Sequence, residues 1–157
     1  MVRAAASIAI LTAVVALGAT EASAQSRTRA GVLTCNVAGG IGLILGSQKA
    51  TACIFDPRRG RNERYTGVIR KFGLDVGATQ RGVIKWAVFS EGNLAPGSLA
   101  GTYVGASAEA TVGAGLGANA LIGGNNRTVA LQPLSVSGQT GLNFALGVGN
   151  LELHVGH

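Results

Sequence analysis

The feature that most constrains this chain is a strict alternation of side chains along residues 100–122. Every even-numbered position there carries a small or apolar residue, whereas most odd-numbered positions carry glycine or a polar residue. A period of two indicates extended β-structure, because successive side chains of a strand point to opposite faces. Strands rarely exceed about ten residues. We therefore expect two strands joined by a glycine bend near residues 113–117.

The glycines of this stretch allow two interpretations. Glycine on one face of a strand permits tight curvature or close approach of another backbone, as at the corner of a barrel. The same small-residue face could instead lie against a ligand, a lipid or a partner. Both interpretations stay open at this level.

Shorter β-type runs fill much of the remaining chain. Residues 30–37 alternate, with Leu33, Cys35 and Val37 on one face. Residues 82–89 form a dense run of β-branched and aromatic side chains that is typical of a core strand. Further runs are expected at residues 41–45, 51–55, 64–76 and 127–131, with a turn-rich connector at 136–141.

The final segment predicts a hairpin from a change of register. Its apolar residues are even-numbered in 142–148 and odd-numbered in 151–155. A two-residue turn at Gly149 and Asn150 would place both sets on one buried face.

These patterns give nine or ten short strands and no convincing amphipathic helix. The predicted fold class is all-β, a small antiparallel barrel or sandwich, with both architectures left open.

The first 24 residues have the character of a cleavable signal peptide. Arg3 precedes an uncharged stretch at residues 4–19, and Ala22-Ser23-Ala24 offers the small-x-small pattern that a signal peptidase requires. The stretch is shorter than the roughly 20 residues of a membrane span. We expect residues 25–157 to form one domain that is periplasmic or secreted, with no integral membrane span after cleavage.

The two cysteines are predicted to form a disulfide. Cys35 and Cys53 are an even pair in a chain expected in an oxidising compartment. The bond would fasten the first predicted strand to the third and close a loop of 19 residues. On the chain-entropy model this stabilises the fold by roughly 3 kcal/mol.

Basic charge is the main functional signal. The formal net charge is +6. A cluster of arginines lies within and directly after the loop expected at residues 56–63. Its members are Arg58, Arg59, Arg61 and Arg64. A positive field attracts anionic surfaces and weakens with salt. After export the expected partner is an anionic lipid, lipopolysaccharide or a cell-wall polymer, with no nucleic acid. The alternative is a solvated loop without a partner.

No catalytic set, metal-ligand spacing or cofactor motif is recognisable, so we expect no enzyme, no metal and no cofactor. His154 alternates with apolar residues and should face solvent. Tyr103 and Glu109 are the candidates to face a ligand, and Glu109 has polar neighbours two positions away in Ser107 and Thr111. A plain solvent-facing role for Glu109 remains the alternative.

Several stretches resemble a known family over nearly all of the exported chain. They are residues 31–35 (GVLTC), 53–55 (CIF), 71–77 (KFGLDVG), 99–113 (LAGTYVGASAEATVG), 130–135 (ALQPLS) and 138–142 (GQTGL). These stretches resemble exported bacterial proteins catalogued as domain of unknown function 992, a resemblance that implies membership but no activity. Residues 103–124 are also similar in style to the β region of SYLF, or Ysc84-like, lipid-binding domains, which hints at envelope or lipid association.

The favoured prediction is a non-enzymatic envelope protein, structural or adaptor-like, whose arginine loop contacts an anionic component. One alternative is a carrier that holds an apolar ligand inside the barrel against the stripe at residues 100–122. A second alternative is an outer-membrane barrel, which is disfavoured because aromatic girdles are missing.

Overall fold

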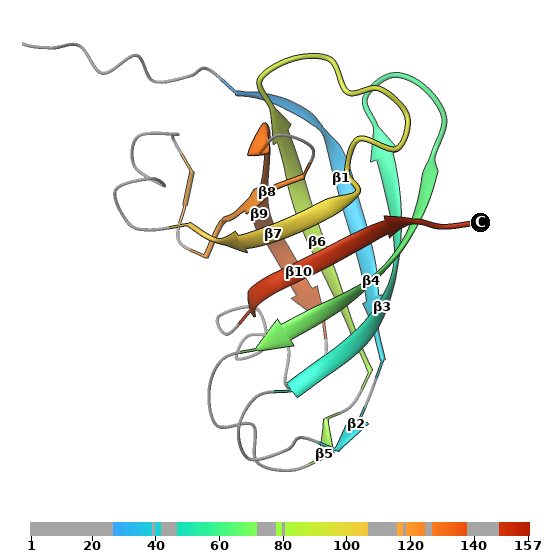
Figure 1. The fold of residues 1–157 in the computed structure, drawn as a ribbon, viewed down its shortest axis with the longest axis vertical. Helices are drawn as coiled ribbons and strands as arrows, with labels where there is room; N and C mark the ends of the chain where they lie inside the picture. Colours follow the sequence, from blue (N-terminus) through green and yellow to red (C-terminus); the bar gives the residue numbers. More distant parts are fainter. Residues whose placement is uncertain are drawn as a thin grey trace, which may run out of the picture.

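The computed structural model describes residues 27–38, 40–41, 47–71, 78–79, 81–106, 116–117, 119–124, 127–137 and 148–157. These residues form β-strands joined by turns and loops (Figure 1). The strands are β1 (Thr28–Val37), β2 (Gly40–Ile41), β3 (Ser47–Pro57), β4 (Glu63–Lys71), β5 (Ala78–Thr79), β6 (Gly82–Ser90), β7 (Gly101–Gly105), β8 (Leu121–Gly123), β9 (Val129–Ser137) and β10 (Val148–Val155). No helix in these ranges is long and apolar enough to cross a membrane.

Eight strands close into one antiparallel barrel in the order β1-β3-β4-β10-β7-β8-β9-β6. The ring is complete because β6 pairs with both β9 and β1. The last strand, β10, lies between β4 and β7. Two short strands, β2 and β5, form a separate ribbon. The all-β prediction is confirmed, and the barrel is the architecture that forms.

The barrel interior is filled by side chains that alternate along each strand. In β1 the predicted inward set of Leu33, Cys35 and Val37 is buried. The largest fully buried side chains are those of Trp86, Tyr65, Tyr103 and Phe55. Interiors of eight-stranded barrels are just wide enough for side chains to fill. Large apolar and aromatic residues at alternate positions therefore supply the core.

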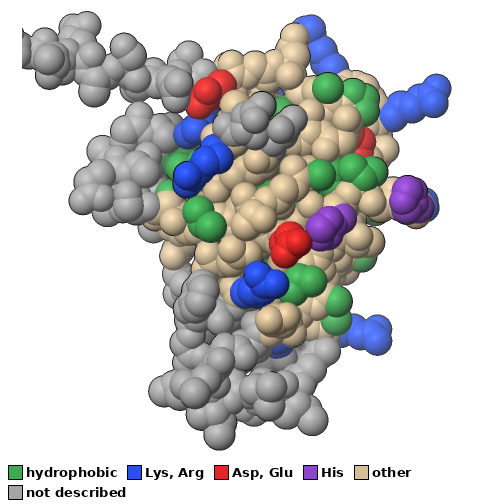
Figure 2. Space-filling model, viewed as in Figure 1, with side chains coloured by type: hydrophobic (Ala, Val, Ile, Leu, Met, Phe, Trp, Pro, Cys, Tyr) green, Lys and Arg blue, Asp and Glu red, His purple; other side chains and the backbone are tan. Residues whose placement is uncertain are grey.

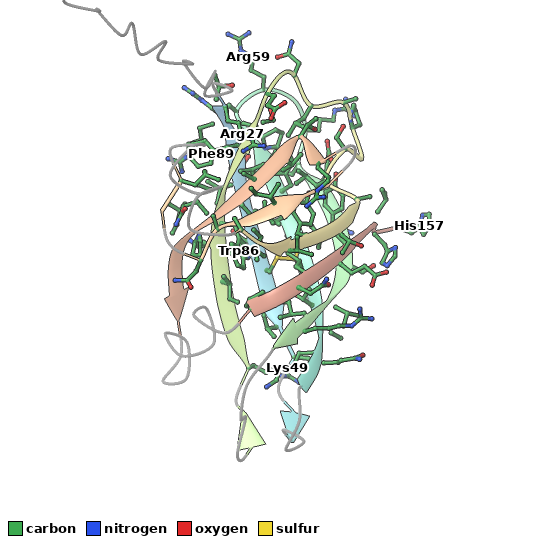
Figure 3. The ribbon with its side chains drawn as sticks, turned by 60° about the vertical axis from the view of Figure 1, so that its left-hand side comes forward. Arg27, Lys49, Arg59, Trp86, Phe89 and His157 are labelled. Atoms are coloured by element: carbon green, nitrogen blue, oxygen red, sulfur yellow. A yellow bond between two sulfur atoms is a disulfide. The ribbon has the colours of Figure 1, made fainter. Side chains whose placement is uncertain are left out.

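The predicted disulfide is present and lies inside this core. Cys35 and Cys53 are direct partners in the pairing of β1 with β3, and their sulfurs are bonded. The partner of Cys35 on β6 is Ile84, so Trp86 lies diagonally across on the same inward face. Diagonal neighbours in a sheet are within reach of an aromatic ring. Figure 3 shows Trp86 beside the yellow sulfur bond.

The stripe at residues 100–122 yields two antiparallel strands, as expected. Its even-numbered face, which the carrier alternative placed inside the barrel, does not face the core in either strand. β7 and β8 pair, with Tyr103 opposite Gly123. Tyr103 and Leu121 are fully buried, whereas Val104 is 38% exposed. Burying one tyrosine ring removes far more apolar surface from water than burying small side chains does. The odd positions therefore face the core, and residues 113–115 of the expected bend lie outside the described ranges.

The predicted terminal hairpin is also wrong. Gly149 and Asn150 lie inside β10, which runs without a turn from Val148 to Val155. Its register against β4 shifts between Val148 and Asn150, as at a β-bulge. One extra residue in a strand reverses the parity of the side chains that follow. The bulge thus explains the change from even to odd apolar positions, and residues 141–147 lie outside the described ranges.

A second bulge lies in β9, which continues through Pro133 to Ser137 and so includes the first two residues of the connector expected at residues 136–141. Residues 138–141 of that connector lie outside the described ranges. Trp86 pairs with Pro133 and Lys85 with Ser135, so Leu134 is the additional residue. Bulges are one of the few places where a sheet accepts proline. Of the other expected runs, residues 42–46 and 72–77 lie outside the described ranges.

Candidate functional site

The predicted arginine cluster forms one end of the barrel. Residues 58–62 connect β3 to β4, and Arg64 follows at the start of β4. We call Arg58, Arg59, Arg61 and Arg64 the arginine loop; all four are exposed. The backbone N–H of Arg58 donates to the carbonyl of Ala30 on β1 at 2.8 Å, which ties the loop to the neighbouring strand. Gly60 sits at a φ of 112°, where an L side chain would be strained.

The arginine loop lies at the upper end of the barrel in Figure 3, where Arg59 is labelled, opposite the end that holds Lys49. Basic side chains also project from this end in the space-filling view (Figure 2). Its backbone turn is held on one side by β1 and on the other by the hydrogen bond from Gly156 N to Arg64 O at 2.8 Å. The guanidinium groups are thus presented to solvent from an anchored backbone.

No ion pair among the described residues includes a member of this loop. Ion pairs join Glu91 to Arg27 at 3.0 Å, and Glu152 to Arg70 at 3.8 Å and His154 at 3.1 Å. None of these pairs includes a member of the arginine loop.

Glu63 is the carboxylate nearest to the loop in sequence, and it is turned toward the protein. Its Oε2 accepts hydrogen bonds from the hydroxyl of Tyr65 and from the backbone N–H of Gly97, the latter at 3.1 Å. Gly97 belongs to residues 91–100, which connect β6 to β7 and which we call the cap segment. Within it Leu99 is fully buried and Leu94 packs against the core. The Glu63 carboxylate thus fastens the cap segment to β4.

The two tyrosines complete this end of the core. Tyr103, one of the two candidates to face a ligand, points into the barrel and is fully buried. Its hydroxyl donates to the carbonyl of Leu99 at 2.9 Å. Burial raises the pKa of Tyr103, and the neighbouring Tyr65 raises it further. Burial likewise raises the pKa of Tyr65, with a contribution from its hydrogen bond to Glu63. Both phenols therefore stay neutral at ordinary pH.

The other predicted site residues have different outcomes. Glu109 lies outside the described ranges, so the structure does not place it beside Tyr103. His154 is exposed on β10, where its Nε2 contacts Glu152. Within the described part of the chain, no group of three or more His, Cys, Asp or Glu side chains could hold a metal.

Arg29 is a basic residue of this end that the sequence interpretation missed. It is exposed on β1, next to Ala30, whose carbonyl holds the arginine loop. The sequence separates Arg29 from Arg58 by 28 residues, and only the pairing of β1 with β3 brings the two segments together. No local sequence pattern distinguishes Arg29 from Arg27, which is mostly buried in its ion pair with Glu91.

Fold and site together define a class: a small antiparallel β-barrel, braced by one internal disulfide, with an exposed basic loop at one end. A disulfide of this kind points to a non-cytoplasmic environment. The chain belongs to the family described as protein of unknown function (DUF992), whose model matches residues 13–154. No curated protein and no solved structure matches the chain. The likeness to SYLF domains stays a prediction.

Proposed function

We propose that this protein is a non-enzymatic component of the cell envelope that binds an anionic envelope molecule through the arginine loop, with Arg29 beside it. The observation that carries the proposal is the arrangement of three exposed guanidinium groups on one anchored turn and a fourth at the start of β4. None of the four forms an ion pair with a described carboxylate. Export to the periplasm or beyond is part of the proposal, and the internal disulfide supports it.

Arginine suits the phosphate and carboxylate groups of such molecules. Its planar guanidinium donates two parallel hydrogen bonds to either group and remains charged at any physiological pH. Anionic lipid headgroups, lipopolysaccharide and cell-wall polymers all present these groups in dense arrays. Several arginines on one turn can bind such an array at once, so moderate individual contacts add up.

A carrier that encloses its ligand is less well supported. The space inside the described strands is occupied by fully buried aromatic and aliphatic side chains. The stripe that was expected to face such a ligand points outward at Thr102 and Val104. An outer-membrane barrel would carry its apolar band outside and polar residues inside. The described strands instead carry apolar residues inside and mostly polar or small residues outside. This distribution does not support the outer-membrane alternative.

The test is sedimentation with vesicles of phosphatidylglycerol and phosphatidylcholine at low and high salt. Each basic residue near an anionic membrane contributes about 1 kcal/mol. Replacing all four members of the arginine loop by serine should therefore weaken binding by on the order of a hundredfold or more. Binding of the native protein should fall as salt is raised. Unchanged sedimentation of the fourfold variant would overturn the proposal.

A matched pair of variants separates the loop from net charge alone. The variant R58S/R59S and the variant R70S/R127S each remove two exposed positive charges. We expect the first to weaken vesicle binding and the second to leave it close to native. Equal losses in both would mean that overall charge, and not the arginine loop, drives the attraction.

A further inference from the structure

A hollow of about 840 Å³ crosses the outer face of four neighbouring strands, β6, β1, β3 and β4. Its floor includes two rows of short, exposed side chains. One row runs through Asn36, Ala52 and Thr66, which are direct partners across β1, β3 and β4. The next consists of Ala38 and Ala50, whose backbones are hydrogen-bonded. We call this feature the outer groove.

Longer side chains form the banks of the outer groove. On one side, the next outward row contains Lys85, Ile54 and Arg64, all exposed. On the other side lie the exposed residues Gln48 and Arg70, which are partners across β3 and β4. Strands lie about 4.8 Å apart, so a groove across four strands is about 14 Å long, and its two rows span about 7 Å. These dimensions suit one slender chain.

Charge around the outer groove is one-sided. Arg81 lines it directly and is exposed, and none of its lining residues is acidic. Lys85 and Arg64 stand on the adjoining bank. Among the described residues, Glu152 on β10 lies beside the Arg70 bank, and its carboxylate contacts Arg70 and His154. A negatively charged group at the Arg81 end would therefore meet attraction without a competing carboxylate in the groove.

The residues that line the outer groove restrict the class of ligand that it could bind. Most of its residues are alanine, valine or glycine, and no aromatic side chain is present on which a sugar ring could stack. The strands beneath it are paired on both sides in the closed barrel, so a peptide cannot join them by β-augmentation. A flexible apolar chain can lie on the alanine methyl groups without needing hydrogen bonds.

We infer that the outer groove binds a single-chain anionic amphiphile of the fatty-acid type, with its chain across Ala50 and Ala52 and its carboxylate at Arg81 and Lys85. This site shares only Arg64, which stands on its bank, with the arginine loop, and it does not depend on the proposed function. It concerns a monomeric amphiphile taken from solution, not a membrane surface.

The experiment is a titration of the full exported chain with sodium laurate below its micelle concentration, followed by amide chemical shifts. Laurate should shift the amides of Ala38, Ala50 and Ala52, and neutral dodecyl maltoside should not. The variant A52W fills the groove from an outward position and should abolish the saturable shifts. The variant T102W places the same side chain outward on β7 and should bind laurate like the native protein.

A second variant tests the charge without altering the floor. Exposed ion pairs are modest, so R81Q and K85Q should each weaken laurate binding about two- to fivefold. Native-like laurate binding by A52W would overturn the inference, as would equal shifts with dodecyl maltoside or competition by a polyglutamate peptide. Shifts confined to the arginine loop would also overturn it. Vesicle binding by A52W should stay native, so the proposal for the outer groove and the proposal for the arginine loop can be refuted independently.

Discussion

The chain has two tyrosines, and the barrel buries both, which makes its stability fall steeply in alkali. An unfolded tyrosine ionises at a pKa of about 10. Burial raises the pKa of Tyr65 and of Tyr103 above that value, so the folded protein keeps both protons where the unfolded chain loses them. Below about pH 10 both states keep these protons, and the folded protein has its full stability. As the pH rises from there toward the folded pKa values, ionisation favours the unfolded chain and the stability falls.

The size of the effect follows from proton linkage. Each phenol that stays protonated only in the folded state costs about 1.4 kcal/mol of stability per pH unit above pH 10. The two tyrosines together cost about 2.7 kcal/mol per unit. A domain of this kind has a free energy of unfolding of roughly 5–15 kcal/mol. A rise of one or two pH units therefore removes a large part of the total.

The variant Y103F isolates one of these phenols. At neutral pH it loses the hydrogen bond to Leu99 and should be less stable by about 1 kcal/mol. Its stability should then fall more slowly with pH, by about 1.4 kcal/mol less per unit. The two stability curves should cross about one unit above pH 10. Beyond the crossing the variant should be the more stable protein.

The assay is urea unfolding by circular dichroism between pH 9 and pH 11.5, with tyrosinate absorbance recorded on the same samples. We expect tyrosinate to appear together with the loss of β-structure. The reasoning is refuted if tyrosinate forms near pH 10 while the circular dichroism spectrum stays native. Parallel stability curves for the native protein and Y103F would refute it equally.

Three further predictions concern the core. The double variant C35A/C53A should lose about 3 kcal/mol of its free energy of unfolding, because the loop of 19 residues is no longer closed in the unfolded chain. Its melting temperature should fall by on the order of 10 °C. A native melting temperature would contradict this prediction. The variant G67A should lose about 1–3 kcal/mol, since its Cβ would lie 2.1 Å from a carbonyl oxygen of β10, whereas G92A meets nothing within 4 Å and should melt like the native protein. Reducing the disulfide should increase the fluorescence of Trp86, because a neighbouring disulfide quenches indole emission; unchanged emission would contradict their diagonal placement.

Much of the fold could be predicted from period-two patterning. The alternation around Cys35 gave the correct inward face of β1, and the cysteine pair predicted the neighbour of that strand. Strong β-branched and aromatic runs identified β6. These features are readable because burial of apolar side chains at alternate positions is the main local signal of a strand.

The errors arise at bulges and among small residues. The extra residues within β10 and at Leu134 in β9 change the parity without any sequence signal of their own. In residues 100–122 the small side chains fit either face, so Tyr103 and Leu121 decide the orientation. The arginine loop was readable from local sequence, whereas Arg29 and the outer groove depend on strands that pair across the barrel.

The position of β10 has a consequence for how the chain matures. While the polypeptide is being synthesised, the flanks of β4 and β7 have no neighbour until residues 148–155 emerge. Strand flanks left open in this way invite pairing with other copies, and pairing between distant segments is slow. A holdase chaperone that binds the extended polypeptide should therefore raise the yield of folded barrel. Deleting residues 148–157 should make the protein aggregate into inclusion bodies.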